Sequence, residues 1–462
     1  MSSNERHPGE VRVPIHEIEH SAFIRDERTK LKSALREAQK QESDSSQRAK
    51  PLIQRVPPVL IGIKEDFKKY FEPRLVALGP LHHGKPQFER AEHTKRKLAG
   101  LFANENETTD EVLFNKIMAE IKDLKQCYNP EDIKDYDDEK LAWMFFVDGC
   151  AVLFAVHYGL QGDFKKLNIK ADLLVFAQLD LFLLENQLPY RVLNILIGST
   201  KDPQMWEQSI TKFVGNNLIT NIPDGKKSQH TDEEEKQEYT HLLERLRTKH
   251  LTGKKEESSS SMIGRLLLSC GDNRKHRKTF RSVKELKESG IGVGPSETNN
   301  LKNISFYCNF LGSLKMPRIL VDDSTASKFL NLVALEMCRD FENDFAVTSY
   351  LYFLDSLIDT AEDVKEMRVT GMLHNYLGSD EEVADLFNKL SRDLVPDQAM
   401  YKDVTDNIHK YCNNPWTTAM AQAYYTHFSS PWTFLGLLAA LLGLLFSAIQ
   451  AYYAFPNHKR SD

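Results

Sequence analysis

The sequence predicts a mainly α protein (α+β with a few short strands), in which a large helical soluble domain is followed by one C-terminal transmembrane helix. Two observations predict this class. Apolar residues recur at helical spacing through several long segments, and the last uncharged stretch of the chain is long enough to cross a bilayer. Apolar residues make up 41% and charged residues 27% of the 462 residues, a composition that supports a buried core.

Residues 1–50 are polar and are predicted to form an N-terminal arm. Within it, Glu19 to Lys40 has the composition of a helix, and Ile24, Leu31 and Leu35 form a thin apolar stripe. Such a stripe suits either a solvated, partly helical arm or a helix that binds a partner, and the sequence leaves both interpretations open.

Residues 51–427 are predicted to form the soluble domain. It begins with two aliphatic runs punctuated by proline and glycine, VPPVLIGI at 56–63 and RLVALGP at 74–80, which are typical of short strands or extended segments. A further strand is predicted at RILV, residues 318–321, and Ser324 is placed to cap the helix that follows.

Three longer segments of this domain predict helices. Residues 111–127 and 137–160 carry apolar residues at helical spacing, and residues 172–196 are apolar nearly all round, which is typical of a buried helix. Polar residues interrupt the third segment and argue against a membrane span there. In the second segment the face predicted to be buried carries Trp143, Phe146, Val147, Cys150, Ala151 and Phe154.

Residues 224–262 break the pattern, because they carry charges of both signs and end in a run of serines. This composition predicts an exposed excursion or mobile linker inside the domain, with a short helix from Glu238 to Lys249.

The membrane segment is predicted at 428–457, where no residue carries a charge, and it leaves a short tail at 458–462. Trp432 lies at one end and Tyr452 and Tyr453 at the other, as aromatic residues do at membrane interfaces. Gly436 and Ala440 are four residues apart, a spacing that lets two membrane helices pack closely. We therefore expect contact with membrane lipid, and self-association of the chain is a further hypothesis.

Composition and motifs exclude several classes of function. The net charge of −6 makes nucleic acid a poor partner. The six cysteines include no pair at zinc-ligand spacing, and no phosphate-binding loop, dinucleotide fingerprint or nucleophile elbow occurs. We therefore predict no catalytic residue, no metal ligand and no cofactor.

Three clusters of polar residues have both a structural and a functional interpretation. His82, His83 and Gly84 are either satisfied structural residues or part of a binding site. Asp148, Gly149 and Cys150 lie on an apolar face, which favours a buried, inert thiol over a nucleophile. Glu185, Asn186 and Gln187 precede Pro189 inside an apolar run, so they are expected either to cross-link a broken helix end or to line a polar pocket.

At these clusters the chain resembles the plant DUF247 family, also called UPF0481. The matching blocks in family order are PRLVALGPLHHG at 73–84, VDGC at 147–150, LLENQLP at 183–189, LKMP at 314–317, NLVALE at 331–336 and LDSLIDT at 354–360. Leu81 and Ala151 depart from the family pattern and look like packing changes. The resemblance implies a mostly helical plant protein on a membrane, and it implies no catalytic mechanism.

Two functions are compatible with the sequence. The first is a membrane-tethered recognition protein whose protein partners are unidentified. The second is an enzyme of unrecognised type, in which His82, His83, Asp148 and Glu185 would converge on one pocket.

The sequence predicts that the bulk of the chain is cytosolic, with an extracellular location as the alternative. No N-terminal apolar segment has the length of a signal peptide, and the hydrophobic helix would be inserted as a tail anchor. Lys459 and Arg460 oppose this orientation, because positive charges favour the cytosolic side. Sequons at Asn106 and Asn303 keep the alternative open.

Overall fold

The computed structural model describes residues 22–44, 52–63, 65–220, 238–253, 282–308, 311–338, 341, 344–417, 419 and 431–454. The chain divides into two compact units, residues 1–50 and residues 51–462. The described part of the first unit is the helix α1 (Ala22–Asp44), on which Leu31 and Leu35 are exposed.

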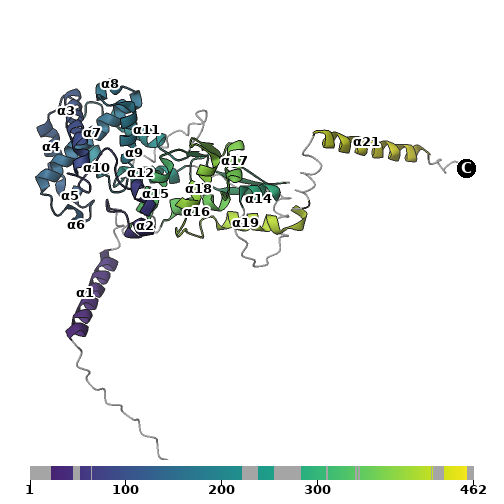
Figure 1. The fold of residues 1–462 in the computed structure, drawn as a ribbon, viewed down its shortest axis with the longest axis horizontal. Coiled ribbons are helices and arrows are strands. Elements are labelled where there is room, and N and C mark those ends of the chain that lie inside the picture. Colours follow the sequence, from purple (N-terminus) through teal and green to yellow (C-terminus); the bar gives the residue numbers. More distant parts are fainter. Residues whose placement is uncertain are drawn as a thin grey trace, which may run out of the picture. The chain divides into compact units, whose positions relative to one another are not determined.

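The first half of the second unit is organised around α7 (Asp138–Gln161), as Figure 1 shows. The Asp137 carboxylate caps its N-terminus by accepting the Lys140 N–H at 2.8 Å, and Gly162 ends it with a φ of +71°. Helices that pack against α7 include α3 (Glu89–Glu105), α4 (Asp110–Ala119), α10 (Tyr190–Ile197) and α11 (Pro203–Asn216). Shorter elements complete this half: α2 (Pro58–Ile63), η1 (Glu65–Tyr70), η2 (Pro86–Phe88), α5 (Ile121–Lys125), α6 (Pro130–Ile133), α8 (Phe164–Leu167) and α9 (Ala171–Asp180).

Among the described residues, the second half combines helices with five short strands. The helices are α12 (Leu242–Leu251), α14 (Val283–Glu288), α15 (Thr325–Glu336), α16 (Ala346–Leu357), α17 (Ala361–Val369), α18 (Asp380–Leu390) and α19 (Lys402–Asn413). The strands are β1 (Ile291–Pro295), β2 (Ser305–Cys308), β3 (Gly312–Met316), β4 (Ile319–Val321) and β5 (Leu373–Asn375). The predicted mainly helical class with a few short strands is confirmed.

The strands form two small sheets. In the three-stranded sheet β3 is central, with β1 parallel to it and β2 antiparallel, so that Leu314 lies opposite both Val293 and Phe306. These three side chains are buried. In the two-stranded sheet β4 pairs with β5 in parallel, with Leu320 opposite His374. The strand predicted at 318–321 is thus present as β4.

Three predictions about the first half are wrong in detail. Residues 58–63 are helical, because Pro58 opens α2 and short aliphatic runs fit either structure. The predicted helix at 172–196 is two helices, α9 and α10, separated by an irregular segment that ends at Pro189, and α9 leaves Val175 and Phe176 exposed. Trp143, which was placed on the buried face of α7, is 47% exposed.

The prediction of an exposed excursion at 224–262 is also wrong in part, because α12 lies within this range and is buried in the domain. Leu243 and Leu246 are fully buried, and the Arg247 Nη2 lies 2.7 Å from the Glu336 Oε1. Glu336 is itself fully buried and accepts the N–H groups of Val347 and Thr348 in the first turn of α16. The rest of the predicted excursion, residues 224–237 and 254–262, lies outside the described residues.

The C-terminal helix α21 spans Pro431–Ala454. The structure has two helices long and apolar enough to be candidate membrane spans among the described residues. One is α7, in which 89% of the apolar window is buried, as expected of a core helix. The other is Leu435–Tyr452 within α21, of which none is buried.

Candidate functional site

Two side chains near the break between α9 and α10 hold the loop at 74–78. The Asp180 carboxylate accepts the backbone N–H groups of Arg74, Leu75 and Val76, with distances of 2.7 to 3.1 Å. Burial raises the pKa of Asp180 against the opposing effect of these donors. Asn186 accepts the Leu78 N–H at 2.7 Å and donates to the carbonyls of Val76 and Asp180 at 2.9 and 2.8 Å. The run at 74–80, for which a short strand or an extended segment was expected, is therefore a loop that is bonded to side chains instead of a neighbouring strand.

Gln187 joins this loop region to the second half of the domain. Its amide donates to the Leu181 and Leu183 carbonyls at 2.8 and 2.7 Å, and its Oε1 accepts the Leu243 N–H of α12 at 3.1 Å. Its backbone carbonyl accepts the Tyr128 hydroxyl at 2.9 Å. Both ends of the side-chain amide and the backbone carbonyl of this buried residue thus have partners, as burial requires.

Glycine is required at two positions of the family blocks. Gly79 has a φ of +63°, and a Cβ there would lie 2.8 Å from the Tyr128 hydroxyl. A Cβ on Gly149 would lie 2.5 Å from Leu196, because α7 and α10 cross closely at this point. The neighbouring Cys150 is fully buried, which raises the pKa of its thiol well above the usual value. Within this block, Gly149 and Cys150 are therefore packed in the core of the domain.

Glu185 and His82 meet at the base of a surface hollow of about 690 Å³, here named the His82 hollow. The His82 Nε2 lies 3.1 Å from the Glu185 Oε2, and the His82 Nδ1 lies 2.7 Å from the Lys85 Nζ. Glu185 also accepts the Val56 N–H at 2.8 Å. Burial acts to raise the pKa of Glu185, but the contacts with His82 and Val56 lower it overall.

Asp148 takes part in a separate group of charges with Lys95 and Glu92. The Lys95 Nζ lies 2.5 Å from the Asp148 Oδ1 and 2.6 Å from the Glu92 Oε1, and it donates to the Ala77 carbonyl at 2.7 Å. The second Asp148 oxygen accepts the Gly79 N–H at 2.9 Å. Burial acts to lower the pKa of Lys95, but the two carboxylates raise it, so the amine remains charged.

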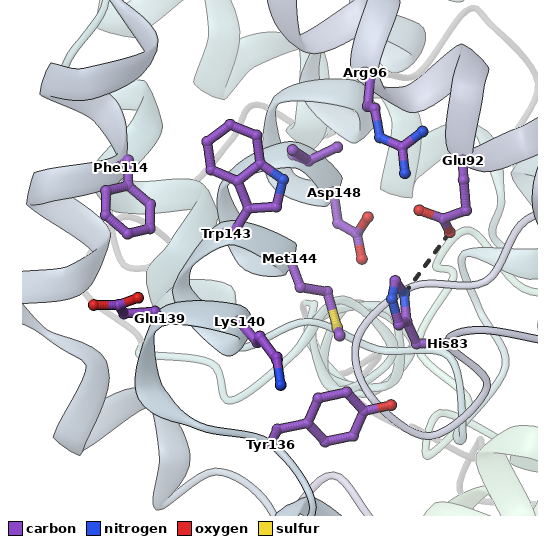
Figure 2. A pocket seen from close by; sticks show the side chains of 11 residues that line it. His83, Glu92, Arg96, Phe114, Tyr136, Glu139, Lys140, Trp143, Met144 and Asp148 are labelled. Atoms are coloured by element: carbon purple, nitrogen blue, oxygen red, sulfur yellow. Dashed lines mark ion pairs between the residues drawn. The ribbon is translucent and has the colours of Figure 1, made fainter.

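This charge group lies at the base of a second hollow of about 410 Å³, here named the Trp143 hollow. Figure 2 shows its aromatic walls and the side chains of Arg96, Glu92 and His83 along one side. The His83 Nδ1 is 4.0 Å from the Glu92 Oε1. The residues that line it are His83, Glu92, Arg96, Phe114, Tyr136, Glu139, Lys140, Trp143, Met144, Val147 and Asp148.

The structure does not bring the four residues of the enzyme hypothesis to one pocket. His82 and Glu185 line the His82 hollow, whereas His83 and Asp148 line the Trp143 hollow. Adjacent residues such as His82 and His83 point in different directions here, so each joins a different set of partners. The hypothesis of one convergent polar pocket is wrong.

Sequence reasoning missed two residues of this region. Lys95 carries the charge that pairs with Asp148. Its signal in the sequence was its place on the apolar face of α3, one turn before Leu98 and two turns before Phe102. Arg96 lines the Trp143 hollow and is exposed, a position that no helical period reveals.

The residues named as a membrane anchor lie on α21. Tyr452 is 78% exposed, and a Cβ on Gly436 would meet no atom within 4 Å. Ala440 is exposed as well. For Trp432 and Tyr453 the structure describes the helical backbone and not the side chain.

Fold and site together define a class of protein: a mainly helical domain whose polar residues cross-link loops and helices, with a candidate membrane helix near its C-terminus. Within the described ranges, no group of three or more His, Cys, Asp or Glu side chains is placed to hold a metal ion. The chain belongs to the plant DUF247 family, described as a plant protein of unknown function, whose sequence profile matches residues 53–446.

Two relatives come from Arabidopsis thaliana. The chain is 28% identical to UPF0481 protein At3g47200 over 437 residues, which cover 89% of this chain and 88% of that protein. It is 27% identical to UPF0481 protein At3g02645 over 175 residues, which cover 38% of this chain and 33% of that protein. No solved structure matches the chain significantly.

Proposed function

We propose that this protein is a single-pass membrane-anchored recognition protein, whose large helical domain lies in the cytosol and binds protein partners. The observation that carries the proposal is α21, a 24-residue helix without a charged residue whose apolar window is not buried. An apolar helix of this length is poorly solvated by water and matches the hydrocarbon thickness of a bilayer.

The polar blocks support recognition over catalysis. Asp180, Asn186 and Gln187 form internal hydrogen bonds, and the Cys150 thiol is buried. Because His82 and Asp148 line different hollows, no single reacting centre unites the candidate groups.

The burial of both sequons supports the cytosolic location. Asn106 is 7% exposed and its amide donates to the Phe102 carbonyl at 2.9 Å, and Asn303 is 3% exposed with its amide 2.8 Å from the Thr298 hydroxyl. Glycans are bulky and need the surface, so a glycan at either position is incompatible with this fold. In the cytosol neither asparagine meets the glycosylation machinery.

Membrane anchoring is tested by two matched pairs of arginine substitutions in the full-length chain. Leu438→Arg with Leu442→Arg places two charges in α21, each of which costs about 2.5–3.5 kcal/mol near a bilayer centre. Leu31→Arg with Leu35→Arg makes the same change, at the same spacing, on the exposed face of α1. We expect only the first pair to release the protein from carbonate-washed membranes. Equal retention of both variants would show that α21 is not the anchor.

Topology needs an exposed reporter, since the natural sequons are buried. The substitutions Asp397→Asn and Ala399→Thr create a glycosylation sequon on the surface. Asparagine at position 397 preserves the turn in which the N–H of residue 399 donates to the side chain of residue 397 at 2.9 Å. We expect no glycan on this reporter and digestion of an N-terminal tag by protease added to intact microsomes. A glycosylated reporter would place the domain in the lumen.

Partner binding is tested by affinity capture, and the structure fixes which deletion is informative. Removing residues 224–262 would delete α12 and leave the buried Glu336 without Arg247, so loss of partners would report unfolding. Removing residues 224–237 alone spares α12. If this variant captures the same proteins as the intact chain, the charged segment is not the recognition element.

A further inference from the structure

The Trp143 hollow presents aromatic surface to solvent in a concave site. Trp143 is 47% exposed although it belongs to the core helix α7, and its ring centroid lies 6.0 Å from that of Phe114. Tyr136 closes the opposite side, and the buried Met144 lies between them (Figure 2). Pockets that bind small ligands have such apolar walls and a volume of this order, and planar rings stack on exposed indole.

Arg96 is the group of the hollow that is suited to bind an anion. Figure 2 shows the Arg96 guanidinium directed into the hollow, and Arg96 forms no hydrogen bond or ion pair with any residue that the structure describes. Of the three carboxylates that line the hollow, Glu92 and Asp148 both contact the Lys95 Nζ. The third, Glu139, is accompanied in the lining by a cation of opposite charge, Lys140. A guanidinium donates two parallel hydrogen bonds to a carboxylate and is the usual protein group for that ligand.

We propose that the Trp143 hollow binds a small aromatic carboxylate, with its ring against Trp143 and its carboxylate on Arg96. This gives the recognition domain a small-molecule site in addition to its protein partners. The site lies between α3, α4 and α7, so it depends neither on membrane anchoring nor on the topology of the chain.

The test is calorimetric titration of the full-length protein in detergent micelles with three probes that share one ring. These are phenylacetate, its neutral analogue phenylacetamide, and the cation benzylamine. We expect phenylacetate to bind at least about tenfold more tightly than the other two, as for a charge-assisted pair. Arg96→Gln should weaken the binding of phenylacetate by about tenfold or more and leave the affinity for phenylacetamide unchanged. Arg90→Gln makes the same change on the exposed face of α3, outside the hollow, and should change nothing.

A second variant tests the aromatic wall. Trp143→Leu should weaken the binding of all three probes, because it removes the stacking surface and leaves Arg96 in place. Urea unfolding of each variant verifies that it is folded, and Arg96→Gln is expected to unfold like the parent since Arg96 is exposed and makes no internal bond. The proposal is overturned by absent phenylacetate binding, by equal affinity for the acid and the amide, or by equal losses in the Arg90 and Arg96 variants. Tighter binding of benzylamine would also overturn it and assign the site to the carboxylates.

Discussion

Replacing Asn186 by leucine should destabilise the domain strongly. Asn186 is fully buried and makes three hydrogen bonds, from the Leu78 N–H and to the carbonyls of Val76 and Asp180. Leucine has the same number and branching of side-chain heavy atoms, so the change removes the bonds without opening a cavity. The effect therefore isolates hydrogen bonding between the loop at 74–78 and the segment before Pro189.

The magnitude follows from these three bonds. The two bonds to the carbonyls of Val76 and Asp180 contribute about 1 kcal/mol each, and the Leu78 N–H, buried with its residue, costs about 1–3 kcal/mol when it is left without an acceptor. We expect a loss of about 3–5 kcal/mol in the free energy of unfolding. Asn186→Asp should cost at least as much, because it keeps the acceptor for Leu78 but turns a carboxylate oxygen toward two carbonyls.

The assay is urea unfolding of the full-length chain in detergent micelles, followed by tryptophan fluorescence. Asn104→Leu is the control, because Asn104 is exposed on α3, and there we expect a change within about 0.5 kcal/mol. An Asn186→Leu protein with the stability of the parent but without partner binding would refute the reasoning and assign the block a role in recognition.

Three further predictions concern other buried positions. Burial lowers the pKa of His241 to about 3, so this residue is neutral in the folded protein, whereas in the unfolded chain it binds a proton near pH 6.5. Its contribution to the free energy of unfolding is therefore full above pH 6.5 and is lost as the pH falls toward 3. The substitution His241→Asn retains the helix cap and should reduce the slope of the free energy of unfolding against pH by about 1.4 kcal/mol per pH unit between about pH 6 and pH 4. An unchanged slope in urea unfolding at a series of pH values would contradict this. Arg247→Met should cost about 3–5 kcal/mol in the same unfolding assay, because it leaves the buried Glu336 carboxylate unpaired. Gly149→Ala should cost about 1–3 kcal/mol through overpacking, whereas Gly100→Ala, which faces open space on α3, should stabilise slightly; equal effects on the melting temperature would argue against a close crossing of α7 and α10.

Local patterns predicted much of the fold. The helix predicted at 137–160 is present as α7, because it has a clear helical period, and the strand predicted at 318–321 is present as β4, which is a short aliphatic run. The prediction that Trp143 is buried was wrong, because the helical period gives the direction of a side chain but not what lies opposite it. At Trp143 the opposite side is a hollow instead of a packed neighbour.

The failures share a physical cause, which is that distant partners decide the outcome. The composition of α12 is polar, yet Leu243 and Leu246 are buried and Arg247 reaches Glu336, 89 residues further along the chain. The block at Glu185 was correctly identified as unusual. Its partners at 74–78 lie more than 100 residues away and have no signature in the local sequence.

The bonds of Asn331 have a consequence for the synthesis of the chain. Its amide donates to the Tyr70 carbonyl at 2.9 Å across 261 residues and its Oδ1 accepts the Leu184 N–H at 2.8 Å across 147 residues. At about 5–20 residues per second, a ribosome needs about 7–30 s to add the second interval and about 13–50 s to add the first. During that time the apolar run around Leu184 has emerged without the helix that covers it. Nascent chains of this protein should therefore be substrates for chaperones that bind apolar segments until α15 has been made.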